Sequence, residues 1–204
     1  MNTLLLHCRP GFESEVCAEI SDQAARLDVA GYAKAKADSA CAEFICNDAA
    51  GPERLMRGAR FARLIFPRQW ACGEWLALPE TDRIGVLLDQ LKSMPVCSSL
   101  WLEVLDTNDG KELSNFCRKF EAPLRKALEK AGRLKEGSHG PRLLLTFKSG
   151  REAFVGFAEA ENSAMWPMGI PRLKFPRQAP SRSTLKLEEA WHHFIPREQW
   201  DERL

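Results

Sequence analysis

The residues from Gly169 to Leu187 carry five cationic side chains and no acidic one. Three prolines interrupt this segment, and each removes a backbone N–H donor and disfavours helix at the residue before it. We therefore predict an extended basic strap, a kind of segment suited to contact with phosphate groups. Its cations are Arg172, Lys174, Arg177, Arg182 and Lys186.

A second group of cations lies between residues 111 and 131, where apolar spacing predicts helix. Pro123 is expected to interrupt it, which gives one helix over 111–120 and another over 123–131. Pairs of cations seven residues apart would then share one side only approximately. A basic face over a buried face suits phosphate contact, which gives affinity without reading sequence. The cations of this group are Lys111, Arg118, Lys119, Arg125, Lys126 and Lys130.

The net charge of +1 hides a strong asymmetry along the chain. Residues 1–50 hold eight acids and four Lys or Arg, whereas residues 111–135 hold eight Lys or Arg and three acids. Such asymmetry indicates a local site for a polyanion on an otherwise neutral protein. The alternative is a solvated helix face with no ligand.

The sequence offers no convincing metal site. Seven cysteines at irregular spacing include no C-x-x-C pair, and we expect them to be reduced and mostly buried. His192 and His193 lie next to each other, so on a helix they point about 100° apart and cannot easily share a ligand. We therefore predict no bound metal.

The order of predicted elements indicates an α+β protein. The first module reads β-α-β-β-α-β, which is the order of a ferredoxin-like fold, and it ends near Leu78. Its expected elements are a strand at 3–7, a helix at 12–27, strands at 31–37 and 42–46, a helix at 52–58, and a strand pair at 61–70 and 71–76.

The second module begins with a helix and contains fewer strands. Its expected elements are a helix at 83–94, a strand at 100–105, the two basic helices, and a hairpin of 143–147 and 152–157. A last helix follows Pro180, with one apolar face predicted from the spacing of its large side chains. That face is formed by Leu185, Leu187, Ala190, Trp191 and Phe194.

The stretch around Lys186 resembles a family motif, S-R-S/A-x-x-K-L-x-E. It matches at Ser181, Arg182, Ser183, Lys186, Leu187 and Glu189. Together with CRPGFESE, RQW and DTNDGKELSNFCRKFEAPLR, it is similar to the ribosomal RNA large-subunit methyltransferase M family. These are bacterial, S-adenosylmethionine-dependent 2′-O-ribose methyltransferases that act on a cytidine of 23S ribosomal RNA. The resemblance implies that Lys186 is the first member of a catalytic Lys-Asp-Lys-Glu tetrad. From the residues alone, Lys186 reads as a solvated helix residue.

The resemblance also implies a domain order. Residues 1–78 would be the ferredoxin-like domain, 79–165 a THUMP RNA-binding domain, 166–182 the basic linker, and 183–204 the first helix of a truncated methyltransferase domain. We expect this chain to hold 23S ribosomal RNA and to contact its own missing methyltransferase domain. We expect no catalysis and no S-adenosylmethionine on the chain alone.

Two other functions remain open at this point. One is a stand-alone RNA-binding or ribosome-assembly adaptor, and the other is a protein-interaction module that docks through its last helix. No stretch reaches the ~20 apolar residues of a membrane span, and no signal peptide is evident. We expect a cytoplasmic monomer that does not engage membranes, with crystal or dimer contacts through the terminal helix.

Overall fold

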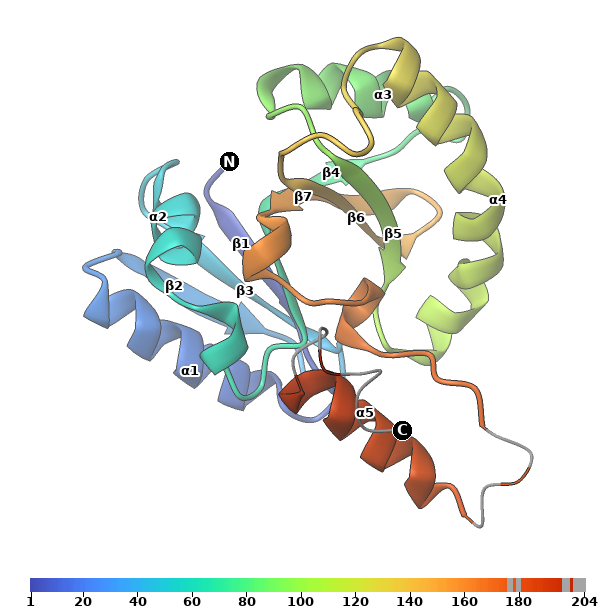
Figure 1. Ribbon diagram of the computed structural model, residues 1–204. Helices are drawn as coiled ribbons and strands as arrows, with labels where there is room; N and C mark the ends of the chain where they lie inside the picture. Colours follow the sequence, from blue (N-terminus) through green and yellow to red (C-terminus); the bar gives the residue numbers. More distant parts are fainter. Residues whose placement is uncertain (176–177, 179–180, 196–198, 200–204) are drawn as a thin grey trace. The chain divides into compact units, whose positions relative to one another are not determined.

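The computed structural model describes residues 1–175, 178, 181–195 and 199 (Figure 1). The chain divides into two compact units, residues 1–169 and 170–204. The first unit begins with β1 (Thr3–His7), α1 (Glu13–Arg26), β2 (Gly31–Ala35), β3 (Cys41–Cys46), α2 (Gly51–Gly58), the 3-10 turn η1 (Phe61–Arg63) and β4 (Gln69–Ala77). It continues with α3 (Arg83–Gln90), η2 (Leu91–Ser93), β5 (Ser99–Val104), α4 (Asn108–Lys130), β6 (Arg142–Ser149), β7 (Glu152–Ala158), η3 (Ala160–Asn162) and η4 (Pro167–Gly169). The second unit contains α5 (Ser183–Phe194).

The first six elements confirm the predicted β-α-β-β-α-β order. β1 lies between β3 and β4 and pairs antiparallel with both, so the local strand order is β2-β3-β1-β4. The predicted strand pair at 61–70 and 71–76 is wrong. Residues 61–63 form a 3-10 turn, and β4 is one continuous strand that starts at Gln69.

β4 joins the two halves of the first unit into one seven-stranded sheet, ordered β2-β3-β1-β4-β7-β6-β5. It pairs with β1 over Gln69–Gly73 and with β7 over Cys72–Ala77. The predicted boundary near Leu78 thus follows a strand that belongs to both halves. The THUMP assignment of residues 79–165 stays a prediction. The predicted linker at 166–182 includes η4, whose Met168 is buried in the first unit.

The helices α1 and α4 pack against the sheet through apolar stripes. In α1, the buried apolar residues are Val16, Ile20 and Ala24, as the predicted helix periodicity requires. In α4 they are Cys117, Leu124 and Leu128, and the rings of Phe116 and Phe120 contact Phe147 of β6 edge to face. Because neighbouring residues of a strand point to opposite faces, Thr146 points away from α4.

α4 is a single helix of 23 residues, so the predicted break at Pro123 is wrong. Pro123 is exposed, and its ring therefore displaces no core side chain. A proline inside a helix removes one backbone hydrogen bond at a cost of about 3 kcal/mol. The buried stripe of α4 runs on both sides of Pro123, and we infer that this packing outweighs the loss. No described helix is long and apolar enough to cross a membrane.

The sheet curls strongly, and two glycines allow it to do so. Gly73 of β4 and Gly156 of β7 form a cross-strand pair. A Cβ atom on Gly73 would lie 2.1 Å from the Val155 carbonyl oxygen, and one on Gly156 would lie 2.7 Å from the Cys72 oxygen. A side chain at either position is therefore excluded, and glycine is typical where a sheet bends tightly.

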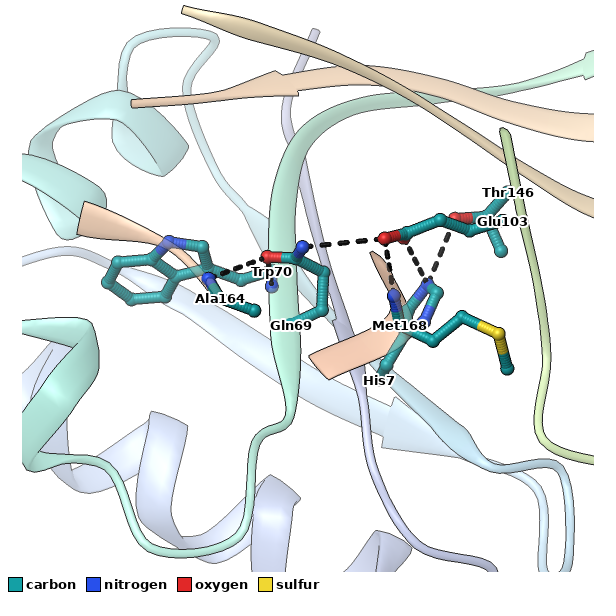
Figure 2. A network of polar contacts seen from close by, with 7 residues as sticks. All are labelled: His7, Gln69, Trp70, Glu103, Thr146, Ala164 and Met168. Atoms are coloured by element: carbon teal, nitrogen blue, oxygen red, sulfur yellow. Dashed lines mark hydrogen bonds and ion pairs between the residues drawn. The ribbon is translucent and has the colours of Figure 1, made fainter. Parts of the chain in front are cut away.

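A buried polar network on the inner face of the curl connects strands that are distant in the sheet (Figure 2). The His7 Nε2 atom of β1 lies 2.9 Å from Thr146 Oγ1 of β6 and 3.9 Å from Glu103 Oε2 of β5. In a flat sheet, β1 and β6 would be about 14 Å apart, because neighbouring strands are separated by about 4.8 Å. The short contact therefore shows that the sheet folds over until its inner faces meet.

The network continues into the segment that follows β7. The Met168 backbone N–H donates to Glu103 Oε1 at 2.6 Å, and Gln69 Nε2 donates to the same oxygen at 3.4 Å. The backbone N–H groups of Trp70 and Ala164 both donate to Gln69 Oε1. These contacts, drawn in Figure 2, hold η4 against the inner face of the sheet.

Burial decides the charge of this network. Desolvation lowers the pKa of His7 to about 4. It raises the pKa of Glu103 to about 7, against the opposing hydrogen bonds from Met168 and Gln69 and the charge of Arg142. His7 is therefore neutral at neutral pH, and Glu103 is largely protonated below pH 7. Glu103 Oε2 has no hydrogen-bond partner in the described part of the chain, which agrees with a carboxyl group that is not fully ionised.

Most thiols are buried, as the sequence predicts. Cys8, Cys46, Cys72, Cys97 and Cys117 are buried, and Cys17 and Cys41 are half-buried. Desolvation raises the pKa of every one of these thiols, so none is set up as a thiolate.

We predict that the two buried titratable groups affect stability with opposite signs. Glu103 binds its proton more tightly when folded, so its contribution falls as pH rises from 4.5 to 7. His7 binds its proton less tightly when folded, so its contribution falls as pH drops from 6.5 to 4. Relative to the parent protein, Glu103→Gln should gain about 3 kcal/mol as pH rises from 4.5 to above 7.

Urea unfolding at several pH values measures both effects. His7→Gln should show the reverse trend to Glu103→Gln, gaining on the parent protein by a similar amount as pH falls from 6.5 to 4. If the stabilities of both variants run parallel to that of the parent at every pH, the described charge states are wrong.

We also predict that Pro123→Ala raises the free energy of unfolding by about 1 to 3 kcal/mol, because it restores a helix hydrogen bond. The neighbouring variant Ala122→Gly is the control, since Ala122 is exposed on the same helix. It should lower the free energy of unfolding by about 1 kcal/mol. A loss of stability in Pro123→Ala would show instead that the core needs the bend imposed by proline.

Candidate nucleic-acid interface

The solvent side of α4 presents the predicted cations together. At 100° per residue, all six fall within an arc of about 140°. Lys119 and Lys126 project opposite the buried Leu124 and Leu128. Arg125 is half-buried, and the other five cations are exposed, namely Lys111, Arg118, Lys119, Lys126 and Lys130. Because α4 continues through Pro123, the six cations align more closely than they would on two separate helices.

The arginines of this face are occupied by neighbouring groups. Arg125 forms ion pairs with Glu121 and Glu136, and Arg118 donates to Asn115 Oδ1 at 2.9 Å. Multiple partners fix an arginine in place and neutralise part of its charge. Arg125 is therefore better suited to holding the loop after α4 than to binding a ligand.

Lys111 donates to Asn108 Oδ1 at 3.5 Å, whereas the other three lysines of this face make no such contact among the described residues. In the part of the chain that the structure describes, the amino groups of Lys119, Lys126 and Lys130 have no hydrogen-bond or ion-pair partner. Glu112 and Glu129 lie in the same arc, so the face is cationic but not uniformly so. When exposed ammonium groups neutralise phosphates, the counterions condensed on the nucleic acid are released, which favours binding.

The other predicted cations lie in the second unit, which is described by itself. Arg172 and Lys174 are exposed in a stretch without helix or strand. Arg182 and Lys186 are exposed at the start of α5. Arg177 lies outside the described residues. A role for these cations in RNA binding stays a prediction.

The apolar side of α5 differs from the predicted one in a single residue. Leu187, Ala190, Trp191 and Phe194 fall within a stripe of about 100°, whereas Leu185 lies on the opposite side of the helix. The exposed fraction is 69% for Leu187 and 82% for Phe194. Exposed side chains of this size on one stripe are typical of a surface that another element covers. His192 Nε2 lies 4.0 Å from Glu188 Oε1, one helix turn earlier.

One basic segment was missed by the sequence reading. Residues 54–70 carry five arginines and no acid, which equals the charge of the basic strap. The count of acids and bases alone could have found it. The expected strand pair at 61–76 rests on the apolar residues of this segment and gives no role to the arginines between them.

Comparisons with known proteins cover almost the whole first unit. Residues 1–71 match the family model "RlmM ferredoxin-like domain". Residues 82–159 match "Ribosomal RNA large subunit methyltransferase M, N-terminal". The two models meet near β4, the strand shared by the two halves of the sheet.

Curated relatives match the chain over its full length. It is 83% identical over 204 residues to the ribosomal RNA large subunit methyltransferase M of Stutzerimonas stutzeri (strain A1501). It is 77% identical to the protein of the same name from Pseudomonas syringae pv. syringae (strain B728a). The alignments cover 100% of this chain and 58% and 57% of those relatives, so the chain spans well under two thirds of their length.

Solved structures are more distant. PH1313 from Pyrococcus horikoshii Ot3 is 8% identical with a TM-score of 0.47, covering 77% of this chain and 54% of that one. TrmN from Thermus thermophilus is 18% identical with a TM-score of 0.46, covering 80% and 47%. Likeness of this degree is too weak to bear on function.

Proposed function

This chain belongs to the ribosomal RNA large subunit methyltransferase M family, and we propose that it is the RNA-holding part of such an enzyme. In this proposal it binds 23S ribosomal RNA and presents one cytidine for 2′-O-ribose methylation. The remainder of the protein would carry out the methyl transfer. The second half of the first unit would serve as the THUMP domain, and residues 170–182 as a basic tether to the catalytic part.

The observation that carries this proposal is the free lysine row of α4, which is Lys119, Lys126 and Lys130. Their amino groups are exposed and lack partners in the described residues, whereas the nearby Arg125 is held by two carboxylates. A row of such groups on a rigid helix is suited to following a phosphate backbone. The shape of an RNA stem, rather than its sequence, would then be recognised.

Lys186 has a chemical role in this proposal. The cofactor S-adenosylmethionine supplies the electrophilic methyl group, and no residue of this chain is proposed to hold it. A ribose 2′-hydroxyl is a poor nucleophile, and it must lose its proton as the methyl arrives. The ammonium group of Lys186 would stabilise the developing alkoxide, or the neutral amine of the same side chain would accept that proton. Its exposure on α5 leaves it accessible for that role.

The apolar stripe of α5 fits the same proposal. Leu187 and Phe194 are exposed on the side of the helix formed with Ala190 and Trp191. The remainder of the methyltransferase is the partner that we propose for this stripe, since burying large apolar side chains is favourable. Lys186 projects from the side of the helix next to this stripe. Docking of the stripe would therefore place Lys186 at the edge of the contact.

The lysine row makes a prediction about RNA binding. In the triple variant Lys119→Gln, Lys126→Gln and Lys130→Gln, affinity for a 23S ribosomal RNA stem-loop should fall. The slope of log affinity against log salt should decrease by about 2 to 3, roughly one for each lost phosphate contact. Fluorescence anisotropy at several salt concentrations measures both.

A matched triple variant controls for the loss of charge. Arg26, Lys36 and Arg151 are exposed cations on α1, after β2 and after β6, and each is replaced by Gln. Arg26 pairs with Asp22 and Arg151 with Glu80, so the variant removes the same formal charge mainly from paired groups, and the slope should stay nearly unchanged. Equal effects of the two triple variants would reduce the proposal to non-specific charge. Absence of salt-dependent RNA binding in the parent protein would support the protein-interaction function instead.

Lys186 makes a separate prediction in the full-length enzyme. Lys186→Met should lower kcat by roughly 10² to 10⁴-fold, the usual range for a lost proton-transfer group. The Kd for RNA should stay the same, and Lys186→Arg should recover part of kcat if charge alone is needed. His193→Gln on the same helix is the control. A raised Kd with unchanged kcat would make Lys186 a phosphate contact rather than a catalytic group.

A further inference from the structure

The acid-free segment 54–70 forms part of an exposed surface on the first half of the sheet. Three of its five arginines are engaged in ion pairs, namely Arg54 with Asp48, Arg57 with Glu53 and Arg68 with Asp106. The other two, Arg60 and Arg63, are exposed, and their side chains have no partner among the described residues. The segment therefore carries positive charge that the fold does not use.

A pair of phenylalanines lies in the same region. The rings of Phe12 and Phe66 stack with centroids 5.9 Å apart and an interplanar angle of 26°. The guanidinium of Arg9 lies 5.9 Å from the Phe12 ring centroid. Phe12 is 37% exposed, and the neighbouring Ile65 is 80% exposed. An aromatic stack that reaches the surface beside arginines has the composition of sites that stack unpaired bases.

The loop that carries Phe66 is fixed by hydrogen bonds. The two carboxylate oxygens of Glu19 on α1 accept from the backbone N–H groups of Ile65 and Phe66 at 2.8 and 3.0 Å. The N–H of Arg68 donates to the His7 carbonyl oxygen at 2.8 Å. Ile65 is therefore exposed on a loop that hydrogen bonds hold in place. Pre-organised side chains lose little conformational freedom when they bind, which favours affinity.

Acids border this surface as well, and two of them are engaged with backbone donors. Both oxygens of Glu19 accept from the loop, so Glu19 fixes the aromatic pair in place. The oxygens of Glu13 accept from the N–H groups of Gly11 and Ala40, and the exposed Glu15 accepts from the Ser14 hydroxyl.

We propose that Arg9, Phe12, Arg63, Ile65 and Phe66, here called the stacking ridge, bind a single-stranded segment of RNA. An unpaired base would stack against the pair of rings formed by Phe12 and Phe66, and the arginines would contact the flanking phosphates. The apolar side chain of Ile65 would cover the edge of a base. This inference rests on the proposed RNA-holding function and adds a second surface to it, with a different ligand from the stem held by α4.

Charge distinguishes this ligand from a protein partner. A protein partner would be expected to supply carboxylates for these arginines, or to bury more apolar area than Ile65 and part of Phe12 provide. Stacking rings next to free guanidinium groups instead match a ligand that alternates planar bases with phosphates.

The test compares single-stranded with double-stranded RNA on the full chain. Phe12→Ala should weaken binding of a labelled oligouridine by roughly 5- to 100-fold, the effect of losing one stacked base. Binding of an RNA duplex of the same length should change less than about 2-fold, because a duplex offers no free base. Phe12→Leu, which keeps apolar bulk but no ring, should behave like Phe12→Ala. Fluorescence anisotropy measures the affinity of the parent protein and of each variant for both RNA ligands.

Arg63→Gln keeps the test independent of folding, because Arg63 is exposed and its side chain makes no hydrogen bond or ion pair among the described residues. It should lower affinity for oligouridine and reduce the salt slope by about one. Tyr32→Ala is the matched control, since Tyr32 is a 58% exposed aromatic on β2 outside the ridge, and it should have no effect.

Three results would overturn the inference. If oligouridine binds equally well to the parent, Phe12→Ala and Arg63→Gln proteins while the α4 variants still lose stem-loop binding, the ridge is wrong and the proposed function stands. If the parent binds no RNA, both are wrong. If the parent self-associates in analytical ultracentrifugation and Ile65→Ser abolishes this without affecting oligouridine, the ridge is a protein interface.

Discussion

The closure of the sheet over the His7, Thr146 and Glu103 contact is the constraint on which the first unit depends. It brings the first strand of the chain against β5 and β6, although two strands separate β1 from β6 in the sheet. Glu103 of the same network also accepts from the Met168 backbone N–H, close to the end of the first unit. The curl therefore joins two halves that sequence describes as separate modules. The helix that carries the lysine row and the loop that carries the stacking ridge then belong to one frame.

Elements with strong periodicity were predictable from the sequence. Alternating burial in β3 and the apolar stripe of α1 are both visible as sequence periodicity, and such patterns predict the order of the first six elements. Two predictions failed for identifiable reasons. The residues 61–68 look like a strand because they are apolar, but they have no neighbouring strand to pair with and form a turn held by Glu19. Pro123 looks like a helix end, but buried residues on both sides of it keep α4 continuous.

The candidate site was predictable only in part. Local spacing placed the cations of α4 on one face, because a helix brings together residues that are close in sequence. It could not show that Arg125 is held by Glu136, which lies beyond the end of the helix. The stacking ridge combines Arg9 and Phe12 with Arg63 and Phe66, and the network combines residues 7, 69, 103, 146 and 168. Contacts of that kind depend on strand register and on the curl, which no local pattern contains.

The partners of each cation separate structural charge from charge left for a ligand. Arg54, Arg57, Arg68 and Arg125 are each held by a carboxylate, and their charge is used within the fold. Lys119, Lys126, Lys130 and Arg63 have no such partner among the described residues. A polyanion that binds the paired group must first break an ion pair, whereas it meets no competitor at the free group. A protein of net charge +1 can therefore bind nucleic acid without a large overall charge, provided that its free cations are gathered on ordered elements.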